Sequence, residues 1–479
     1  MVRTRMAPSP TGEYHIGHIR TLLYNYALAK KHNGQFILRI EDTDRERFVE
    51  GATDRILDVI KDYGLSWDEG PRVDGPYGPY IQSERLELYK KYAEELVEKG
   101  HAYYCFCSSE RLKELRESQQ KQGLRPMYDR YCLENLDVQE AKQRVIDGEA
   151  YVIRLKIPRD ETITFHDEVL GDISFQGEEI DDQVLMKSDG FPTYHLGVVV
   201  DDHLMEITHI MRGSDWVSST PKHVLLYRFL GWEAPKFTHL PNIKEVGASK
   251  KLSKRFGAVS AREFLDEGYL PEALLNFLMF LGWNPGTDDE LFTLDEFVKR
   301  FSMDGLHKSD LIAFDREKLL WYNGMYIRNL GVGELVDRIV TYDDTFEPID
   351  RKYLVKVVAL TQERLKTLGE FKTQTDYFFN EITISLETIV QKGKALEETK
   401  EILPKIIEIL ESIKAEEWSV EIIEKMLKKL HESLPDWSPK QFFMTIRVAL
   451  TGETATPPLF DVVAVLGKEI VLKRLNTLE

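Results

Sequence analysis

The sequence has few cysteines, no long apolar run and fewer basic than acidic residues. Only 3 of its 479 residues are cysteine, an odd number that argues against a disulfide framework and leaves reduced thiols or metal ligands. Nowhere do about 18 apolar residues follow one another, and the N-terminus lacks an apolar stretch, so we expect a cytoplasmic protein without a membrane span. The pattern Gly-x4-Gly-Lys-Ser/Thr is also absent, which excludes the usual phosphate loop of kinases and ATPases.

The charge balance, taken alone, argues against a nucleic-acid partner. The chain carries 63 basic and 81 acidic residues, a net charge of −18, whereas nucleic-acid-binding domains are usually basic. A basic track along one face is still compatible with an acidic chain. The length exceeds the roughly 250–300 residues at which single cores stop growing, so we expect several globular domains.

Residues 5–18 (Arg5-Met-Ala-Pro-Ser-Pro-Thr-Gly-Glu-Tyr-His-Ile-Gly-His18) form the most informative stretch. A short strand, a loop with proline and glycine, and a helix pattern over 19–31 follow one another, and such a helix N-terminus favours a phosphate or another anion. His15 and His18 would present imidazole N–H groups to one side, and Gly17 would let a ligand approach the backbone. The alternative is a histidine pair that only caps the helix.

Three groups of charged residues, far apart in the sequence, follow this stretch. The buried strand predicted over 35–40 ends in an acidic cluster that begins at Glu41, a position that lines the ligand crevice in open α/β sheets. The alternative is a solvated acidic turn that caps the helix over 50–64. Asp201 and Asp202 would point to opposite faces as adjacent strand residues, so we interpret them as structural rather than as a metal pair. The basic run 251–255 lies between two glycines, where such runs are usually solvated.

Together these motifs resemble the class I aminoacyl-tRNA synthetases, and among them the bacterial glutamyl branch. The match comprises Ala7-Pro-Ser-Pro-Thr-Gly12 with His15-Ile-Gly-His18, then Arg39-Ile-Glu-Asp-Thr-Asp44, Asp201-Asp-His-Leu-Met205 and Lys251-Leu-Ser-Lys-Arg255, in the family's order. It is strong over residues 1–330 and looser beyond them. The resemblance implies an α/β fold: a Rossmann-like catalytic domain with a parallel sheet, an inserted α+β acceptor-binding domain, and an all-α C-terminal anticodon-binding region.

The resemblance also sets the domain boundaries that we predict. They are 1–104 for the first half of the catalytic nucleotide-binding fold, 105–187 for the inserted acceptor-binding domain, 188–256 for the second half of the catalytic fold, 257–330 for a helical stem-contact region and 331–479 for the anticodon-binding domain.

An amino-acid pocket is implied by the same resemblance. Glutamate has two carboxylates and one ammonium group, and the arginine fork binds carboxylates bidentately. The residues implied are Arg5 and Tyr194 for the γ-carboxylate, Arg212 for the α-carboxylate, and Ser9 and Glu41 for the amine, with Ala7 in the same site. One departure is Val198, where the family commonly has Asn, since valine cannot donate a hydrogen bond; glutamate is still the expected substrate.

The family's reaction is the ATP-dependent formation of glutamyl-adenylate, followed by transfer to the 3′ end of tRNA(Glu). The resemblance places His15, His18, Lys251 and Lys254 in catalysis, because they would stabilise charge on the phosphates. Gly17, Asp215, Trp216 and Ser253 complete the ATP-binding set. Mg²⁺ is implied by the triphosphate. We also expect a monomer whose adenylate forms only when tRNA is bound.

A metal site is implied near residue 105. The spacing of Cys105, Cys107, Tyr128 and Cys132 resembles the structural zinc site of some family members, with the tyrosine oxygen as an unusual fourth ligand. Reduced thiols without a metal are the alternative.

The chain beyond residue 256 is predicted to be mostly helical, without sustained strand alternation after residue 340. Apolar spacing of three to four residues predicts helices over 272–281, 319–326, 352–368, 400–410, 420–430 and 440–450. Arg364 lies near the position where an arginine of some relatives reads the last anticodon base.

Three alternatives stay open. A glutamyl-queuosine-type paralogue would end near residue 300, and a glutaminyl enzyme would need β-barrels in the C-terminal half. A catalytically silent paralogue that binds tRNA or a partner protein is a third, and the intact His15, His18 and Lys254 argue against it. The sequence leaves open whether tRNA(Gln) is also charged.

Overall fold

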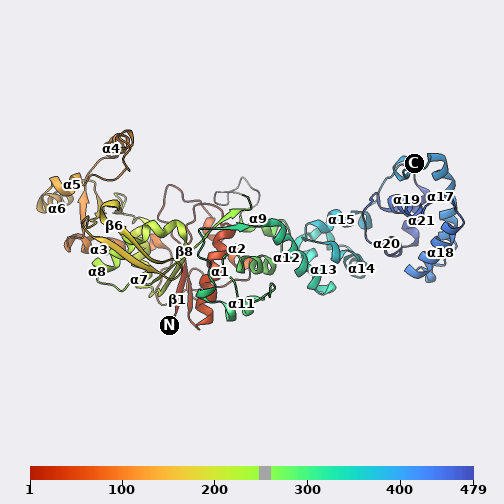
Figure 1. The fold of residues 1–479 in the computed structure, drawn as a ribbon, viewed down its shortest axis with the longest axis horizontal. Coiled ribbons are helices and arrows are strands. Elements are labelled where there is room, and N and C mark those ends of the chain that lie inside the picture. The colour runs from red at the N-terminus through yellow and green to blue at the C-terminus, as the bar shows by residue number, and fades with distance from the viewer. Residues whose placement is uncertain (248–259, 479) are drawn as a thin grey trace. The chain divides into compact units, whose positions relative to one another are not determined.

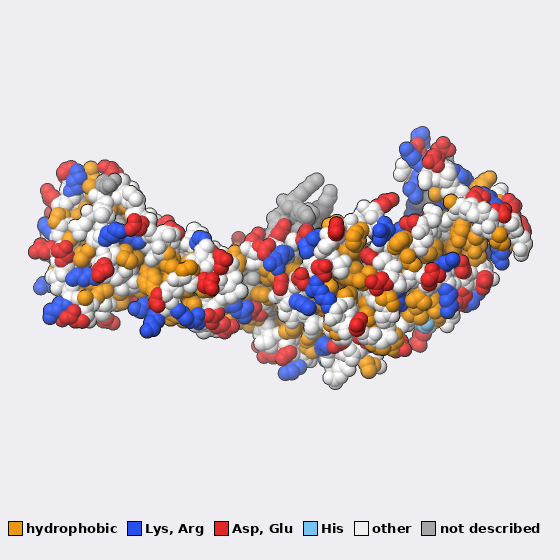
Figure 2. Space-filling view, turned by 180° about the vertical axis from the view of Figure 1, so that it is seen from behind, with side chains coloured by type: hydrophobic (Ala, Val, Ile, Leu, Met, Phe, Trp, Pro, Cys, Tyr) orange, Lys and Arg blue, Asp and Glu red, His pale blue; other side chains and the backbone are white. Residues whose placement is uncertain are grey.

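A computed structural model describes residues 1–247 and 260–478 of the chain (Figure 1). It forms two compact units, one made of Met1–Leu265 with Pro271–Arg316 and the other of Asp266–Leu270 with Glu317–Glu479. On the face that Figure 2 presents, acidic and basic side chains are interspersed. No helix in the described residues has the length and apolar character to cross a membrane.

The first unit is a mixture of strands and helices. Its strands are β1 (Arg3–Met6), β2 (Gln35–Leu38), β3 (Ala102–Cys105), β4 (Val152–Leu155), β5 (Thr162–Asp167), β6 (Gly171–Gln176), β7 (Val184–Met186), β8 (His209–Gly213), β9 (Lys236–Leu240), β10 (Asn242–Glu245) and β11 (Leu311–Phe314). Its helices are α1 (Ile16–Lys31), α2 (Ala52–Asp62), α3 (Leu86–Glu98), α4 (Ser109–Lys121), α5 (Tyr131–Asn135), α6 (Val138–Ile146), α7 (Tyr194–Leu204), α8 (Thr220–Leu230), α10 (Pro271–Met279) and α11 (Leu294–Arg300). Short 3₁₀ turns are η1 (Gln82–Glu84), η2 (Gly177–Glu179), η3 (Ser214–Ser219) and η5 (Met303–Gly305), and α9 (Ala261–Asp266) and α12 (Arg316–Asn329) run across the division between the units.

Parallel strands form the centre of the first unit, as predicted. β1 pairs with β2 and β8 pairs with β9, both in parallel. β1 also lies beside β8, where the Thr208 amide donates to the Arg3 carbonyl at 3.0 Å. β5 joins β9 in parallel through Asp167 and Phe237, so strands from within 105–187 extend the sheet of the nucleotide fold.

Helix α1 begins three residues earlier than its apolar pattern predicts, at Ile16, because the His15 side chain caps it. The His15 Nδ1 accepts from the Gly17 amide, and lysines in the last turn complement the helix dipole. The helix packs on β1, β2 and β8 through buried residues such as Leu22. A Cβ at Gly34, which connects α1 to β2, would lie 2.0 Å from the Val2 carbonyl oxygen, so this connection requires glycine.

The structure corrects one element assignment. Asp201 and Asp202 lie on helix α7 and not on a strand. The apolar run before them fits a buried helix as well as a buried strand, which makes periodicity ambiguous here. Val198, on the same helix, packs in the apolar core.

The inserted segment contributes antiparallel strand pairs to the first unit. β3, β4 and β7 make an antiparallel sheet, and β5 forms a hairpin with β6. Figure 1 shows α4, α5 and α6 grouped together, away from α1 and α2.

Within the described residues from 317 to 478, helices are the only regular secondary structure, as predicted. The second unit contains α13 (Val332–Tyr342), α14 (Arg351–Thr361), α15 (Glu370–Phe379), α16 (Leu386–Ile389), α17 (Leu396–Glu411), α18 (Val420–Glu432), α19 (Pro439–Thr451), α20 (Leu459–Leu466) and α21 (Lys468–Asn476), with 3₁₀ turns η6 (Asp344–Phe346), η7 (Gln362–Arg364) and η8 (Ala415–Glu417). The helix predicted over 352–368 is shorter, because α14 ends at Thr361 and passes into η7.

Candidate functional site

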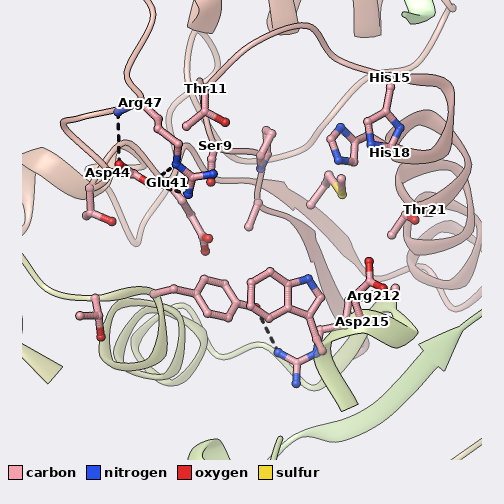
Figure 3. A pocket seen from close by; sticks show the side chains of 18 of the residues that line it. Ser9, Thr11, His15, His18, Thr21, Glu41, Asp44, Arg47, Arg212 and Asp215 are labelled. Atoms are coloured by element: carbon pink, nitrogen blue, oxygen red, sulfur yellow. Dashed lines mark hydrogen bonds and ion pairs between the residues drawn. The ribbon is translucent and has the colours of Figure 1, made fainter. Parts of the chain in front are cut away.

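A cavity of about 1290 Å³ opens beside the start of α1 and the carboxyl ends of β1 and β8 (Figure 3). Every residue predicted for substrate binding within the described part of the chain lines it: Arg5, Ala7, Ser9, His15, Gly17, His18, Glu41, Tyr194, Arg212, Asp215 and Trp216. Lys251, Ser253 and Lys254 lie outside the described residues. Val198 does not belong to the described lining, so its apolar side chain meets the core instead of a ligand.

A network of buried ion pairs forms the floor of this cavity. Asp202 Oδ1 accepts from Arg5 Nε at 3.1 Å and from an Arg39 terminal nitrogen at 2.8 Å. The other terminal nitrogen of Arg39 donates to Glu41 Oε1 at 3.0 Å. Burial alone would raise the pKa of Asp202, but Arg5 and Arg39 outweigh it and lower that pKa below its ordinary value. Asp202 is therefore ionised at neutral pH, and it orients both arginines.

The neighbouring Asp201 carries a second set of bonds. It accepts from Arg85 Nε at 2.7 Å, and from Gln82 and the Tyr89 hydroxyl at 2.8 Å each. The structural interpretation of the two aspartates is thus confirmed by their contacts, although their element was assigned wrongly.

Glu41 combines burial with an opening toward the cavity. Burial raises its pKa above the ordinary value, against the opposing effect of Arg39 and Arg5. An ammonium group placed beside Glu41 would favour the ionised carboxylate. Ionisation of Glu41 and binding of the ammonium group therefore favour each other.

Opposite Glu41, Arg212 reaches the cavity from β8. A terminal nitrogen of Arg212 donates to the Tyr194 hydroxyl at 3.1 Å, and the Tyr194 ring packs on Trp216 with centroids 4.1 Å apart. Burial raises the pKa of Tyr194, so its hydroxyl stays protonated and can donate to a bound carboxylate.

The other end of the cavity suits a nucleotide. The His15 and His18 rings stack with centroids 3.7 Å apart at the N-terminus of α1. His15 caps the helix through Nδ1, and such a cap is compatible with a phosphate site at the same helix N-terminus. Asn242 donates to Asp215 Oδ1 at 2.7 Å and so fixes the position of that carboxylate.

Sequence reasoning missed several polar residues of the site. Arg39 was part of a quoted motif but received no role, and the buried partners of Arg212 received none: Asp167, Thr220, His223 and His239. Asn242, Arg45, Arg47 and Lys187 also line the cavity. His239 lies in β9 among both polar and apolar residues (Lys-Phe-Thr-His-Leu), so no local sequence signal marked it as a buried partner.

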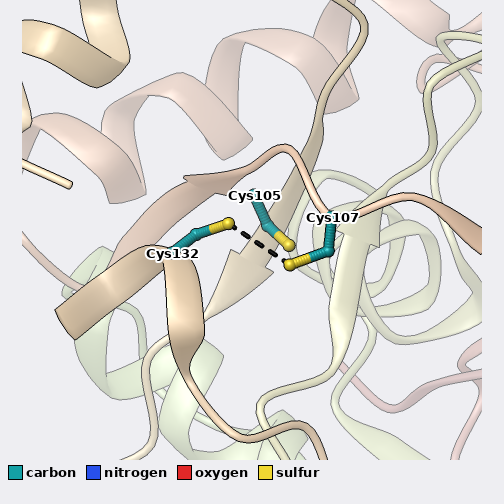
Figure 4. Close-up of side chains that lie close together, drawn as sticks. All are labelled: Cys105, Cys107 and Cys132. Atoms are coloured by element: carbon teal, nitrogen blue, oxygen red, sulfur yellow. Dashed lines mark hydrogen bonds between the residues drawn. The ribbon is translucent and has the colours of Figure 1, made fainter. Parts of the chain in front are cut away.

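The three cysteines converge as predicted (Figure 4). Their sulfur atoms all lie within 4.8 Å of one another, and Cys107 and Cys132 are 3.4 Å apart. The Tyr128 hydroxyl lies 3.4 Å from Cys105 Sγ and 3.3 Å from Cys107 Sγ. A hydrogen bond from Cys132 lowers the pKa of the Cys105 thiol. The group can hold a metal ion.

Arg364 lies in the second unit, on η7. Its terminal nitrogens donate to the carbonyls of Thr456 and Ala455 at 3.1 and 3.4 Å. Arg447 binds the same carbonyl of Thr456, so two guanidinium groups meet at the loop between α19 and α20.

Two family models match consecutive parts of the chain. Residues 1–321 match the catalytic domain of "tRNA synthetases class I (E and Q)", and residues 334–478 match an "Anticodon binding domain".

Named relatives are similar over nearly the full length. The chain is 44% identical to the glutamate–tRNA ligase of Clostridioides difficile over 99% of this chain and 98% of that protein, and 43% identical to that of Finegoldia magna with the same coverage. A crystal structure of a glutamate tRNA ligase from Elizabethkingia meningosepticum in complex with its amino acid superposes with a TM-score of 0.89 at 34% identity, covering 99% of this chain and 98% of that one. The glutamate-tRNA synthetase of Elizabethkingia anophelis gives a TM-score of 0.86 at 33% identity, covering 99% of each chain.

The buried ion network generates a stability prediction. Asp202→Asn leaves Arg5 and Arg39 without a shared anion, so we expect the free energy of unfolding to fall by about 3–5 kcal/mol, the usual cost of breaking a buried pair. Because the folded-state pKa of Asp202 is lowered, this contribution is present above its ordinary pKa of about 4 and is lost as the pH falls through the folded-state value.

Urea unfolding of both proteins from neutral to acidic pH measures the effect. The difference between wild type and Asp202→Asn should be largest at neutral pH and shrink below about pH 4. Asp172→Asn, which breaks the exposed pair with His166, is the matched control and should change stability little. Equal losses in the two variants would contradict the prediction.

Proposed function

Because this chain belongs to the class I tRNA synthetases of the E and Q family, we propose that it is a glutamate–tRNA ligase. Its substrates are L-glutamate, ATP as the Mg²⁺ complex, and tRNA(Glu). The observation that carries the proposal is the set of charged side chains in the cavity, where Arg5, Arg212 and Glu41 surround one end. Two cations and one anion complement the two carboxylates and one ammonium of glutamate.

Positioning of the amino acid follows from these contacts. We assign the α-carboxylate to Arg212, the γ-carboxylate to Arg5 with the Tyr194 hydroxyl, and the ammonium to Glu41 with Ser9. Glutamate would then lie with its α-carboxylate toward the nucleotide end of the cavity. That carboxylate is the nucleophile in the first step.

In the first step a carboxylate oxygen attacks the α-phosphorus of ATP, and the bond to the pyrophosphate breaks. The donors His15 and His18 at the start of α1, together with Lys251 and Lys254, would stabilise negative charge on the phosphates. Asp215 and Trp216 would hold the rest of the nucleotide. In the second step a hydroxyl of the terminal adenosine attacks the mixed anhydride and AMP leaves.

Neither step needs a covalent enzyme intermediate. Orientation and charge stabilisation supply the catalysis, which agrees with a cavity lined by fixed cations rather than by an activated nucleophile.

The C-terminal helices carry the second part of the proposal. We propose that residues 331–479 bind the anticodon and that residues 105–187 bind the acceptor end, with Arg364 as an anticodon-reading residue. The convergence of Arg364 and Arg447 on one loop supports this, because paired guanidiniums suit base edges and phosphates. Action as a monomer, dependence of adenylate formation on tRNA and a cytoplasmic location stay predictions.

The cysteine cluster completes the proposal with a structural zinc ion. A tetrahedral zinc with sulfur ligands at about 2.3 Å separates the sulfurs by roughly 3.8 Å, and the sulfur atoms of Cys107 and Cys132 lie close to that spacing. Cys105, Cys107, Cys132 and the Tyr128 oxygen would hold the ion, whose role would be to crosslink the end of β3 to residues 128–132, which include the start of α5. The catalytic steps do not involve it.

Aminoacylation with radiolabelled glutamate tests the function. Using separately purified tRNA(Glu) and tRNA(Gln), we expect tRNA(Glu) to be charged, and pyrophosphate exchange to require tRNA. Charging of tRNA(Gln) as well would identify a non-discriminating enzyme. Charging of neither tRNA would reject the proposal, and rapid exchange without tRNA would reject tRNA dependence.

Lys254→Ala distinguishes an enzyme from a binding paralogue. The change removes a cation assigned to the developing charge on the phosphates, so we expect pyrophosphate exchange to fall by about a hundredfold or more while tRNA binding persists. Lys236→Ala, at an exposed lysine of β9, is the control. Retained exchange with lost tRNA binding would favour a protein that only binds tRNA.

Metal content tests the zinc proposal. Wild-type protein should retain zinc after dialysis, and Tyr128→Phe should retain less and melt at a lower temperature, because one of the four ligands is lost. Tyr131→Phe, at an exposed tyrosine next to the cluster, is the matched control. A metal-free wild type would establish the reduced-thiol alternative, and unchanged zinc in Tyr128→Phe would remove the tyrosine from the ligand set.

A further inference from the structure

On the side away from the cavity, Arg212 donates hydrogen bonds to side chains that have no role in the proposed function. Its Nε donates to His239 Nε2 at 3.1 Å. One terminal nitrogen donates to His223 Nδ1 at 3.2 Å, and the other donates to Thr220 Oγ1 at 2.9 Å. Arg212 and these three partners are all buried. The guanidinium plane is therefore fixed on the side away from the cavity.

The proton positions in this cluster follow from hydrogen-bond chemistry. A guanidinium only donates, so His239 Nε2 must be an unprotonated acceptor and the ring proton must lie on Nδ1. His239 Nδ1 lies 2.7 Å from Asp167 Oδ2, which accepts that proton's hydrogen bond. Asp167 also accepts from the amides of His239, Val169 and Leu170 at 3.0, 3.0 and 2.9 Å. A fixed carboxylate thus sets the tautomer and orientation of His239.

His223 also accepts a hydrogen bond from Arg212, so its tautomer is fixed in the same way. His223 Nδ1 accepts from Arg212, so its proton lies on Nε2 and is donated to His195 Nδ1 at 3.1 Å. Burial lowers the pKa of His239 and holds that of His223 well below its ordinary value, and burial also lowers the pKa of His195 to about 3. The imidazoles are therefore neutral, and they add no positive charge beside Arg212.

The arrangement differs from that of the other arginines of the cavity floor. Arg5 and Arg39 bind the Asp202 carboxylate directly. In the described residues, the hydrogen bonds that Arg212 donates go to imidazole and hydroxyl groups, and the nearest carboxylate, that of Asp167, lies one imidazole away. Neutral acceptors can orient a guanidinium without forming a direct ion pair with it, so Arg212 stays available to bind a substrate carboxylate.

We propose that Asp167, His239, His223 and Thr220 form an orienting relay that holds Arg212 for the α-carboxylate of the substrate. They are positioning residues, because they act through Arg212 and do not line the cavity themselves. The proposal rests on the proposed function, which assigns that carboxylate to Arg212. The property that the relay controls is the affinity for the amino acid, not for ATP or tRNA.

His239→Leu tests the relay, because leucine removes the acceptor for Arg212 Nε while keeping an apolar volume. We expect the KM for glutamate in aminoacylation to rise by about tenfold to a hundredfold, the loss of one hydrogen bond to a charged group, with the KM for ATP unchanged. His239→Gln, whose amide oxygen can take the place of Nε2, should restore most of the affinity. His203→Leu is the control, since His203 stacks on Trp232 away from Arg212.

Thermal unfolding of each variant separates positioning from folding. Thr220→Val is nearly isosteric and removes the acceptor for a terminal nitrogen of Arg212, so it should also raise the glutamate KM selectively and serves as the test if His239→Leu does not fold. Unchanged glutamate KM in Thr220→Val and in a folded His239→Leu, or equal rises in the KM for glutamate and for ATP, would overturn the relay alone. A wild-type protein that charges no tRNA with glutamate would overturn the proposed function and the relay together.

Discussion

The floor of the cavity depends on the carboxylate of Asp202, because the guanidiniums of Arg5 and Arg39 share it. Arg5 comes from β1, Arg39 follows β2, and Asp202 comes from α7, more than a hundred residues further along the chain. Removing these charges from water is costly, and only close pairing offsets the cost. Strands β1 and β2 and helix α7 are therefore held at a fixed separation by an interaction that tolerates little displacement.

Asp201 extends the same constraint to a neighbouring segment. Being adjacent on α7, the two aspartates point in different directions, and Asp201 binds Arg85 beside η1 and Tyr89 in α3. The helix that begins with the cavity-lining Tyr194 is thus anchored near its far end by charged groups. Anchoring of this kind gives a binding side chain a fixed position without involving it in the structural bonds.

Residues that form local motifs could be predicted from the sequence, whereas residues whose role depends on distant partners could not. The loop before α1 and the acidic residue after β2 were placed in a binding site because their motifs resemble those of a known family, whereas their local patterns alone also fitted a helix cap and a solvated turn. His239 and Asp167 lie 72 positions apart and were not predicted, since neither has a local pattern. The Asp201–Asp202 pair shows a further limit: a short apolar run followed by acids fits either a helix or a strand, and only packing against α3 and α8 decides between them.

The charged groups of the cavity floor and Arg212 together affect which amino acid the cavity can bind. The guanidiniums of Arg5, Arg39 and Arg85 are matched by the carboxylates of Glu41, Asp201 and Asp202. Arg212 lies outside these pairs and donates to neutral groups, and the nearest carboxylate, that of Asp167, lies one imidazole away. Because Asp167 adds a fourth carboxylate to match the fourth guanidinium, a preference for glutamate over glutamine does not follow from net charge. It follows from direct contacts: a guanidinium forms charge-assisted, bidentate bonds with a carboxylate, whereas an amide offers it one neutral oxygen. The orientation of Arg212 decides whether such a bond can form.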